Sequence, residues 1–256
     1  MLTRIANFLS KFGSRIQNYG YLLANPSYTH VRDGQGCAEL YRLLNKAWFP
    51  KNKIRSVLDV GANKGQFIQT SLALLPDTPI YAFEPIPEVA QKLKERYSTI
   101  EHINIFQVAL GVQREALLLH ISQFLPASSL LKPQKQLLSE FPEVKIRDSV
   151  EVVVERLDTL IQAIPNINLP ALLKIDVQGF EMEVLAGATA VLHQVSVIVC
   201  EVNLANLYEK QCAIDEIIQF LKIYHFQLVD IGNPIRSQLN QEILYIDLAF
   251  KNLNIS

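Results

Sequence analysis

Length, composition and charge indicate a globular chain and exclude several classes of protein. The chain has 256 residues, 49% of them hydrophobic and 19% charged, which is enough to bury a core and excludes a disordered or fibrous protein. Lysine and arginine number 24 against 25 aspartate and glutamate, so the net charge of −1 offers no basic field for nucleic acid. Three widely separated cysteines argue against a disulfide scaffold or a structural zinc site.

No apolar run reaches the roughly 20 residues that span a bilayer, and the N-terminus has no signal-peptide pattern. We therefore expect a cytoplasmic protein with reduced thiols. Residues 1–50 are expected to form a helical extension, and residues 51–256 the main domain. Apolar residues recur at helical spacing with basic residues between them, at Leu2, Ile5, Phe8, Leu9, Phe12 and Ile16. This helix either packs on the domain or on a second copy of the chain, or it contacts anionic lipid or a lipid-linked substrate at a membrane surface.

Patterns typical of strands and helices alternate after residue 55. Strands are expected at 56–60, 80–83, 103–110, 117–121, 150–154, 171–175, 195–200, 227–231 and 244–250. Helices are expected at 37–48, 65–75, 87–97, 157–163, 182–192 and 215–224, and residues 122–148 form an irregular excursion with a short helix at 135–140. This alternation predicts an α/β domain with a parallel sheet and a terminal antiparallel hairpin.

The first chemical signal is a glycine-containing turn between a strand and a helix. It reads Asp59-Val60-Gly61-Ala62-Asn63-Lys64-Gly65. Glycine lets the backbone approach a ligand closely, and a helix N-terminus offers free N–H groups. The spacing differs from the G-x-G-x-x-G of dinucleotide-binding proteins and favours a nucleoside or a carboxylate over a pyrophosphate. A tight connection without a ligand is the alternative interpretation.

The second signal is Glu84, which follows the strand expected at 80–83 and stands 23 positions after Gly61. An acid at the end of the neighbouring strand can accept hydrogen bonds from both hydroxyls of a ribose. Taken alone, Glu84 is equally consistent with a solvated loop carboxylate. The two signals together predict a nucleoside site.

These signals, with further motifs, resemble the FkbM family of class I S-adenosylmethionine-dependent methyltransferases. The matching segments are Asp59–Phe67, Ala82–Pro87, Ser128-Ser129, Val154–Asp158, Leu173–Glu181, Val184–Ala188 and Glu201. The run K-I-D-V-Q-G-F-E, followed by V-L-A-G-A, is more specific than the first two segments. Residues 1–50 lie outside the resemblance.

The resemblance implies a Rossmann-like α/β fold with a doubly wound, mostly parallel, seven-stranded sheet of order 3-2-1-4-5-7-6, in which strand 7 is antiparallel. S-adenosylmethionine would lie across the carboxyl ends of strands 1 and 2, with Glu84 on the ribose and Asp59 fixing the loop or the amino group. No acid follows the third strand, so backbone groups near Gln107 or Val108 would hold the adenine. The implied cofactor-binding residues are Asp59, Gly61, Ala62, Asn63, Gly65, Phe67, Glu84, Pro85, Gln107, Val108, Ala109 and Asp176.

Acidic residues follow two other strands of the expected sheet, Asp176 after 171–175 and Glu201 after 195–200. An alcohol must be held in line with the methyl group and must lose its proton to a base. Asp176 and Glu201 are therefore the candidate bases, and Lys174 and Glu181 complete the catalytic candidates. Helix capping by Asp176, a dipole role for Glu181 and ion pairing of Lys174 are the structural alternatives. Three carboxylates could instead bind a divalent cation, but their spacing does not demand one, and we expect no metal.

The excursion at 122–148 is expected to form a lid over the substrate, because loops at strand ends often carry specificity. Ser128, Ser129 and Gln178 are the candidate substrate-binding residues; an irregular connection without ligand contacts is the alternative.

We expect an O-methyltransferase that acts on a hydroxyl of a sugar, glycan or secondary metabolite, with no nucleic-acid partner. An NAD-dependent oxidoreductase and a non-catalytic module that binds S-adenosylmethionine are the alternative functions. Whether the chain forms a homo-oligomer is open.

Overall fold

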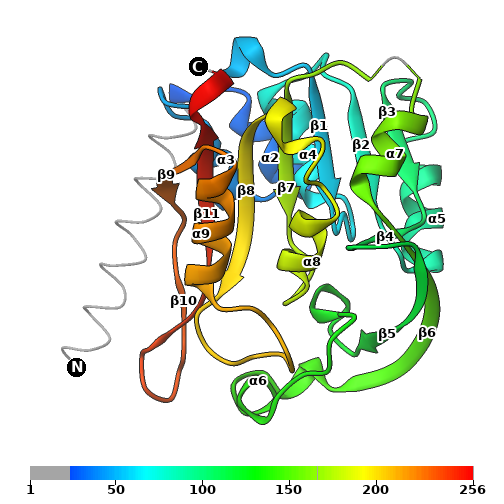
Figure 1. Cartoon of the computed structure of the whole chain (residues 1–256), viewed down its shortest axis with the longest axis vertical. Helices are drawn as coiled ribbons and strands as arrows, with labels where there is room; N and C mark the ends of the chain where they lie inside the picture. The colour runs from blue at the N-terminus through cyan, green and yellow to red at the C-terminus, as the bar shows by residue number, and fades with distance from the viewer. Residues whose placement is uncertain (1–23, 166, 256) are drawn as a thin grey trace.

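The computed structural model describes residues 24–165 and 167–255 of the chain, which fold around a mixed central sheet (Figure 1). Its parallel strands are β1 (Ser56–Val60), β2 (Ile80–Phe83), β3 (Ile103–Phe106), β7 (Ala171–Ile175) and β8 (Val195–Asn203). At one end, the long strand β11 (Ile243–Asn252) runs antiparallel to β8 and to the strands β9 (Phe226–Ile231) and β10 (Ile235–Arg236).

The order of the strands confirms the expected topology. The path through the sheet is β10-β11-β8-β7-β1-β2-β3, and β9 also pairs with β11. Apart from the short extra strand β10, this is the order 3-2-1-4-5-7-6 with an antiparallel seventh strand. The order reverses between β1 and β7, and open sheets of this kind bind ligands at the carboxyl ends of the strands near that point.

The central strands are buried on both faces, which explains their continuous apolar sequences. Every residue of β1 and β7 is buried. The two charged exceptions, Asp59 and Lys174, stand directly opposite each other in the register of these two strands. Their charges therefore meet inside the sheet.

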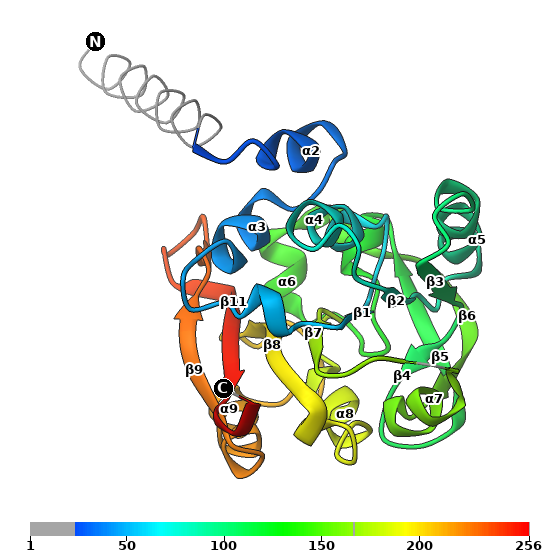
Figure 2. The same cartoon turned by 90° about the horizontal axis from the view of Figure 1, so that it is seen from above.

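Helices cover both faces of the sheet, as the view from above shows (Figure 2). One hydrophobic core lies under α2 (Tyr28–Asp33), α3 (Ala38–Leu44), α4 (Gln66–Leu74) and α5 (Pro87–Arg96). The other lies under α7 (Leu157–Ala163), α8 (Glu181–Ala186) and α9 (Ile214–Ile223). Because α2 and α3 share a core with α4, the described part of the N-terminal extension packs on the domain. The apolar helix expected at 2–16 lies outside the described residues.

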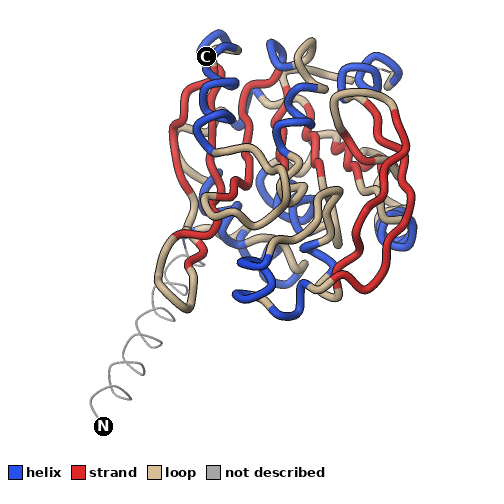
Figure 3. The backbone as a smooth tube through the Cα atoms, turned by 60° about the horizontal axis from the view of Figure 1, so that its bottom comes forward, coloured by secondary structure: helices blue, strands red, loops and turns tan. Residues whose placement is uncertain are grey.

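A second, smaller sheet stands beside β3 and corrects one sequence prediction. It contains β4 (Ala109–Leu110), β5 (Glu115–Ser122) and β6 (Ile146–Glu155), and its two long strands run side by side in Figure 3. The single strand expected at 103–110 is therefore wrong. The chain leaves the central sheet after Phe106, because Ala109 and Leu110 find their backbone partners on β6.

The helices expected at 37–48 and 182–192 are shorter in the structure. The first ends at Leu44. The second ends at Ala186 and is followed by Gly187, where an added Cβ would lie 1.9 Å from the carbonyl oxygen of Gly111. The excursion holds α6 (Lys135–Glu140) between two 3₁₀ turns, Leu125–Ala127 and Pro142–Val144. Among the described residues, no helix combines the length and the hydrophobicity needed to cross a membrane.

Candidate functional site

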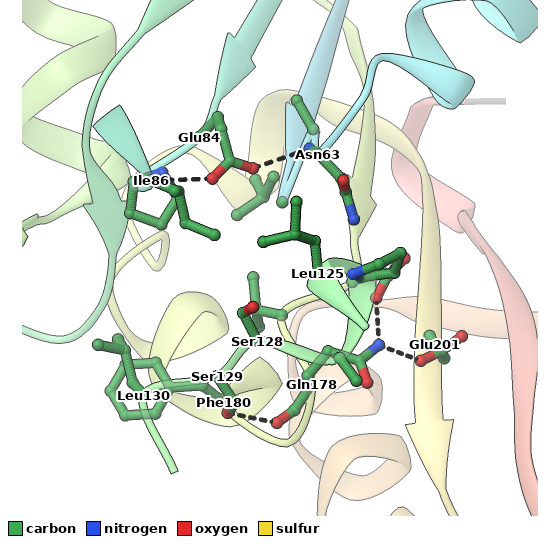
Figure 4. Close-up of a pocket in the computed structure, with 18 of the residues that line it drawn as sticks. Asn63, Glu84, Ile86, Leu125, Ser128, Ser129, Leu130, Gln178, Phe180 and Glu201 are labelled. Atoms are coloured by element: carbon green, nitrogen blue, oxygen red, sulfur yellow. Dashed lines mark hydrogen bonds between the residues drawn. The ribbon is translucent and has the colours of Figure 1, made fainter. Parts of the chain in front are cut away.

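A cavity of about 550 Å³ opens at the carboxyl ends of the central strands and is roofed by the excursion (Figure 4). Most of the predicted site residues line it. They are Gly61, Ala62, Asn63, Phe67, Glu84, Pro85, Val108, Ala109, Ser128, Ser129, Lys174, Asp176, Gln178 and Glu201. The structure does not bring Asp59, Gly65, Gln107 and Glu181 to the cavity wall.

At the β1–β2 end, the backbone of the glycine turn is tied to Glu84. One oxygen of this carboxylate accepts a hydrogen bond from the backbone N–H of Asn63 at 2.8 Å, and the other accepts one from Ile86 at 2.8 Å (Figure 4). Burial raises the pKa of Glu84 to about 7, against the opposing effect of these hydrogen bonds. Each oxygen keeps a lone pair that a ligand hydroxyl can use.

The glycine at the centre of the turn is required by the fold itself. Gly61 has a φ of +77°, and an added Cβ would lie 1.9 Å from the backbone oxygen of Asp176. The missing side chain thus makes room for the loop after β7, whereas the sequence suggested that it makes room for a ligand. A cofactor contact at Gly61 stays a prediction, although the residue lines the cavity.

Apolar side chains complete this end of the cavity. The rings of Phe83 and Phe106 stack with centroids 5.4 Å apart at the ends of β2 and β3. Val108 and Ala109 line the wall beside them, where the chain passes from β3 to β4. Such surfaces can contact the flat faces of a planar, largely apolar group.

Lys174 contacts residues at both ends of the cavity. Its ammonium donates a hydrogen bond to the carbonyl of Gly61 at 2.8 Å and lies 3.3 Å from Asp59 and 3.6 Å from Asp176. Burial alone would lower the pKa of Lys174, but the charges of the two aspartates outweigh it and hold the pKa above its usual range. Lys174 therefore remains charged and positions its neighbours.

At the β7–β8 end, one amide joins the two candidate bases. The side-chain nitrogen of Gln178 donates to Asp176 at 2.8 Å and to Glu201 at 2.7 Å. Its side-chain oxygen accepts the hydroxyl of Tyr208 at 2.8 Å. Gln178 has a φ of +60°, a conformation that few non-glycine residues adopt. The loop backbone thus holds a strained residue whose side chain fixes both carboxylates.

Negative charge accumulates around this pair. Burial and the neighbouring carboxylate of Asp176 raise the pKa of Glu201 well above its ordinary value. Asp247 stands opposite Glu201 in the register of β8 and β11, and burial followed by the charge of Asp176 raises its pKa to about 7. A carboxyl group with a raised pKa is a stronger base when ionised, but it also keeps its own proton to a higher pH.

Glu181 supports the loop from beneath. It is 3% exposed, and one of its oxygens accepts hydrogen bonds from the backbone N–H groups of Gly179 at 2.9 Å and Val177 at 3.3 Å. Burial raises the pKa of Glu181 to about 7. This geometry fits a positioning role in the loop that carries Gln178.

The other three predicted residues that do not line the cavity are Asp59, Gly65 and Gln107. Asp59 is fully buried beside Lys174, and Gly65 precedes α4 with a φ of +83°. Gln107 is exposed, whereas its neighbour Val108 lines the cavity.

The excursion forms part of the cavity roof, as the sequence suggested. The hydroxyl of Ser129 donates to the backbone oxygen of Gln178 at 2.7 Å (Figure 4), and the hydroxyl of Ser128 accepts from the backbone of Ser122 at 3.1 Å. Both serines line the cavity, and both also hold the roof in place. Their contact with a substrate stays a prediction.

Sequence reasoning missed several lining residues. Tyr208, Tyr245 and Asn203 come from the last strands and their connections, and Cys37 and Leu40 come from the N-terminal extension. An isolated polar residue in an apolar strand is the signal that could have identified Tyr245. The segment around Leu40 carries no such signal, because its apolar residues look like ordinary core.

Among residues 24–165 and 167–255, no group of three or more histidine, cysteine or acidic side chains is arranged to hold a metal ion. The expectation of a metal-independent reaction stays a prediction.

Comparisons with known proteins agree with this architecture. A family model described as the methyltransferase FkbM domain matches residues 59–228. The chain is 28% identical over 179 residues to 2-O-methyltransferase NoeI of Sinorhizobium fredii (strain NBRC 101917 / NGR234), a match that covers 68% of this chain and 72% of that protein. It is 29% identical over 142 residues to Methyltransferase 1 of Beauveria bassiana (strain ARSEF 2860), covering 51% and 57% respectively.

The crystal structure of a methyltransferase FkbM from Methylobacillus flagellatus KT is similar at a TM-score of 0.47 with 16% identity, over 76% of this chain and 43% of that chain. The segment matched by the family model exceeds half of the chain and contains the glycine turn, Glu84, the excursion and both candidate bases. The chain therefore belongs to the FkbM family of methyltransferases.

Proposed function

We propose that this protein transfers a methyl group from S-adenosylmethionine to a hydroxyl of a carbohydrate or a secondary metabolite. The observation that carries the proposal is that two carboxylates, Asp176 and Glu201, are joined by one amide in the same cavity that contains Glu84. The similarity to a protein described as a 2-O-methyltransferase supports transfer to oxygen.

The residues present fit this cofactor. Four acidic side chains and one lysine line the cavity, so its charge complements a ligand with a positive sulfonium and a positive amino group. The buried side-chain oxygen of Asn63 has no hydrogen-bond partner among the described residues and is available to a ligand. Glu84 would bind the ribose, the turn from Gly61 to Asn63 would hold the methionine part, and Val108 with Ala109 would contact the adenine.

S-adenosylmethionine, when bound, supplies a methyl carbon on a positively charged sulfur that is open to in-line attack. The chain's part is to orient the acceptor hydroxyl and to take its proton at an oxygen of Asp176 or Glu201. Gln178 keeps these two oxygens a fixed distance apart, and Lys174 holds Asp176 from the other side.

The test is a methyl-transfer assay with isotopically labelled S-adenosylmethionine and a panel of sugars, oligosaccharides and lipid-linked glycans, read by mass spectrometry. We expect one labelled methyl group on an acceptor oxygen. Asp176→Asn and Glu201→Gln should each slow transfer by about 100-fold, the usual effect of losing a positioned acid–base group.

Two exposed carboxylates away from the cavity provide matched controls. Asp77→Asn and Glu151→Gln make the same chemical changes and should leave the rate unaltered. Wild-type rates in both cavity variants would overturn the assignment of the base. Binding of NADH in place of S-adenosylhomocysteine would overturn the proposed cofactor.

A further inference from the structure

The cavity extends beyond the two candidate bases into a region with apolar walls. Five of its side chains come from the excursion and from the connection after β8. They are Phe124, Leu137, Phe141, Val144 and Leu207, and the last four pack together with Tyr208. The switch point of the sheet places the cofactor at the β1–β2 end, so this second region is left for the acceptor.

Hydrogen bonds hold the apolar roof in place. The backbone N–H of Gln134 donates to the carbonyl of Leu207 at 2.7 Å, and its side chain donates to the carbonyl of Tyr208 at 3.1 Å. The hydroxyl of Ser129 joins the roof to the loop that carries Gln178. The apolar wall is thus a built part of the fold and faces the cavity from a fixed position.

One large apolar side chain of this wall is left in contact with solvent. Phe124 is 52% exposed and lines the cavity, whereas Leu137 and Val144 deeper in the roof are 4% exposed. Covering an exposed phenylalanine with an apolar group of a ligand removes it from water and strengthens binding. Phe124 can therefore contact a part of the acceptor that lies outside the reacting end.

The charges of the cavity disfavour an anionic acceptor. Glu84, Glu143, Asp176 and Glu201 line it, and Lys174 is the only basic side chain that does so within the described part of the chain. The ammonium of Lys174 is already engaged by two aspartates and two backbone carbonyls. A phosphate or carboxylate on the acceptor would meet the acidic side chains of Glu143 and Asp176 without a free cation to balance it.

We propose that the acceptor is an uncharged amphipathic molecule. Its hydroxyl lies at Asp176 and Glu201, and an alkyl or other apolar group runs along the roof to Phe124. This inference rests on the proposed function and narrows its substrate class: a bare, phosphorylated or otherwise anionic sugar does not fit, and a glycan or metabolite with an apolar substituent does.

Binding of simple probes to the full chain tests the inference. Methyl glucoside, octyl glucoside below its micelle concentration and glucose 6-phosphate are titrated by calorimetry, with and without S-adenosylhomocysteine. We expect octyl glucoside to bind at least about tenfold more tightly than methyl glucoside, because its chain buries further apolar surface. Glucose 6-phosphate should bind more weakly than either.

Variants at two exposed apolar residues distinguish binding in the cavity from non-specific binding of an alkyl chain. Phe124→Ser should remove the advantage of octyl glucoside, and Leu118→Ser should keep it, because Leu118 is 53% exposed on β5 but does not line the cavity. Equal binding of the methyl and octyl glucosides, tighter binding of the phosphate, or an octyl advantage that survives in Phe124→Ser would each overturn the inference. Failure of S-adenosylhomocysteine to bind would instead overturn the proposed function on which it rests.

Discussion

The two ends of the cavity are built from different materials. At the β1–β2 end, the contacts are between a buried carboxylate, Glu84, and the backbone N–H groups of Asn63 and Ile86. At the β7–β8 end, they are between the side chains of Asp176 and Gln178 in the loop after β7, Glu201 in β8 and Tyr208 in the connection after β8. Backbone contacts suit a ligand that never changes, and side-chain contacts can be altered to suit different acceptors.

The two ends also differ in how their charges are balanced. Backbone hydrogen bonds oppose the effect of burial on Glu84. At the other end, Asp176, Glu201 and Asp247 accumulate around Lys174, and the pKa values of Glu201 and Asp247 are raised. Burial thus raises the pKa of a carboxyl group at both ends, and the ends differ in what opposes it: backbone N–H groups at the first end, and the side-chain amide of Gln178 at the second.

The largest expected effect comes from the residue that joins the two ends. Gly61→Ala places a Cβ 1.9 Å from the backbone oxygen of Asp176 in a residue with a φ of +77°. We expect the free energy of unfolding to fall by more than about 3 kcal/mol. Urea unfolding measures it. Gly232→Ala, where no positive φ is required and the nearest atom is a side-chain carbon at 3.1 Å, should cost less than about 1 kcal/mol. Similar losses in the two variants would contradict the role of Gly61.

The second-largest expected effect tests the β1–β2 end of the cavity alone. Glu84→Ala removes the carboxylate expected on the ribose and leaves the N–H groups of Asn63 and Ile86 without their acceptor. We expect the affinity for S-adenosylhomocysteine to fall by about 30- to 100-fold in calorimetry. Glu88→Ala, on the exposed side of α5, is the matched control and should bind normally. Unchanged affinity in Glu84→Ala would show that the nucleoside lies elsewhere.

A smaller effect isolates the β7–β8 end. Gln178→Glu keeps the shape of the side chain but replaces the donor that joins Asp176 and Glu201 with a third acidic group. We expect methyl transfer to slow by about 10- to 30-fold, while the affinity for S-adenosylhomocysteine changes less than about threefold. Gln227→Glu, exposed on β9, controls for the added charge. An equal loss of cofactor affinity and rate would mean that the two ends do not act separately.

Much of the fold follows from the sequence because its signals are local. The apolar runs of β1 and β7, the helix breaks at prolines and the alternation of elements determine the order of the sheet once the parallel connections are taken as right-handed. The break after Phe106 could not be predicted in this way. It depends on β6, which offers the partners for Ala109 and Leu110 at Val154 and Glu155, far later in the chain.

The same difference between local signals and long-range contacts decides which residues of the site could be predicted. The glycine turn and Glu84 are recognisable because one short motif sets each backbone conformation. The neighbours of Glu201 cannot be recognised from the sequence in this way. Asp247 lies beside Glu201 only because of the register between β11 and β8, and Tyr208 lies near it only because its hydroxyl donates a hydrogen bond to Gln178. Leu40 also lines the cavity, although it lies outside the segment matched by the family model. No local motif indicates this position.

The last effect is spread over a range of pH and tests the carboxyl group of Glu181, which supports the loop that carries Gln178. The pKa of Glu181 rises from an ordinary value of 4.5 to about 7 on folding, so the folded chain binds more protons than the unfolded chain between these two values. The contribution of this group to stability is therefore fully present below pH 4.5 and is lost as the pH rises to about 7. Glu84 and Asp247 act in the same direction, because their pKa values also rise to about 7.

In the wild type, the free energy of unfolding should decrease between about pH 5 and about pH 8. We expect this decrease to be smaller in Glu181→Gln, by about 1–3 kcal/mol. Urea unfolding at several pH values measures the slope. Glu88→Gln makes the same change on the exposed side of α5 and should keep the slope of the wild type. An unchanged slope in Glu181→Gln would mean that Glu181 is already ionised in the folded chain at about pH 5. The loop that carries Gln178 would then be held by a charged acceptor, and the reasoning that links burial to proton binding at the β7–β8 end would have to be reversed.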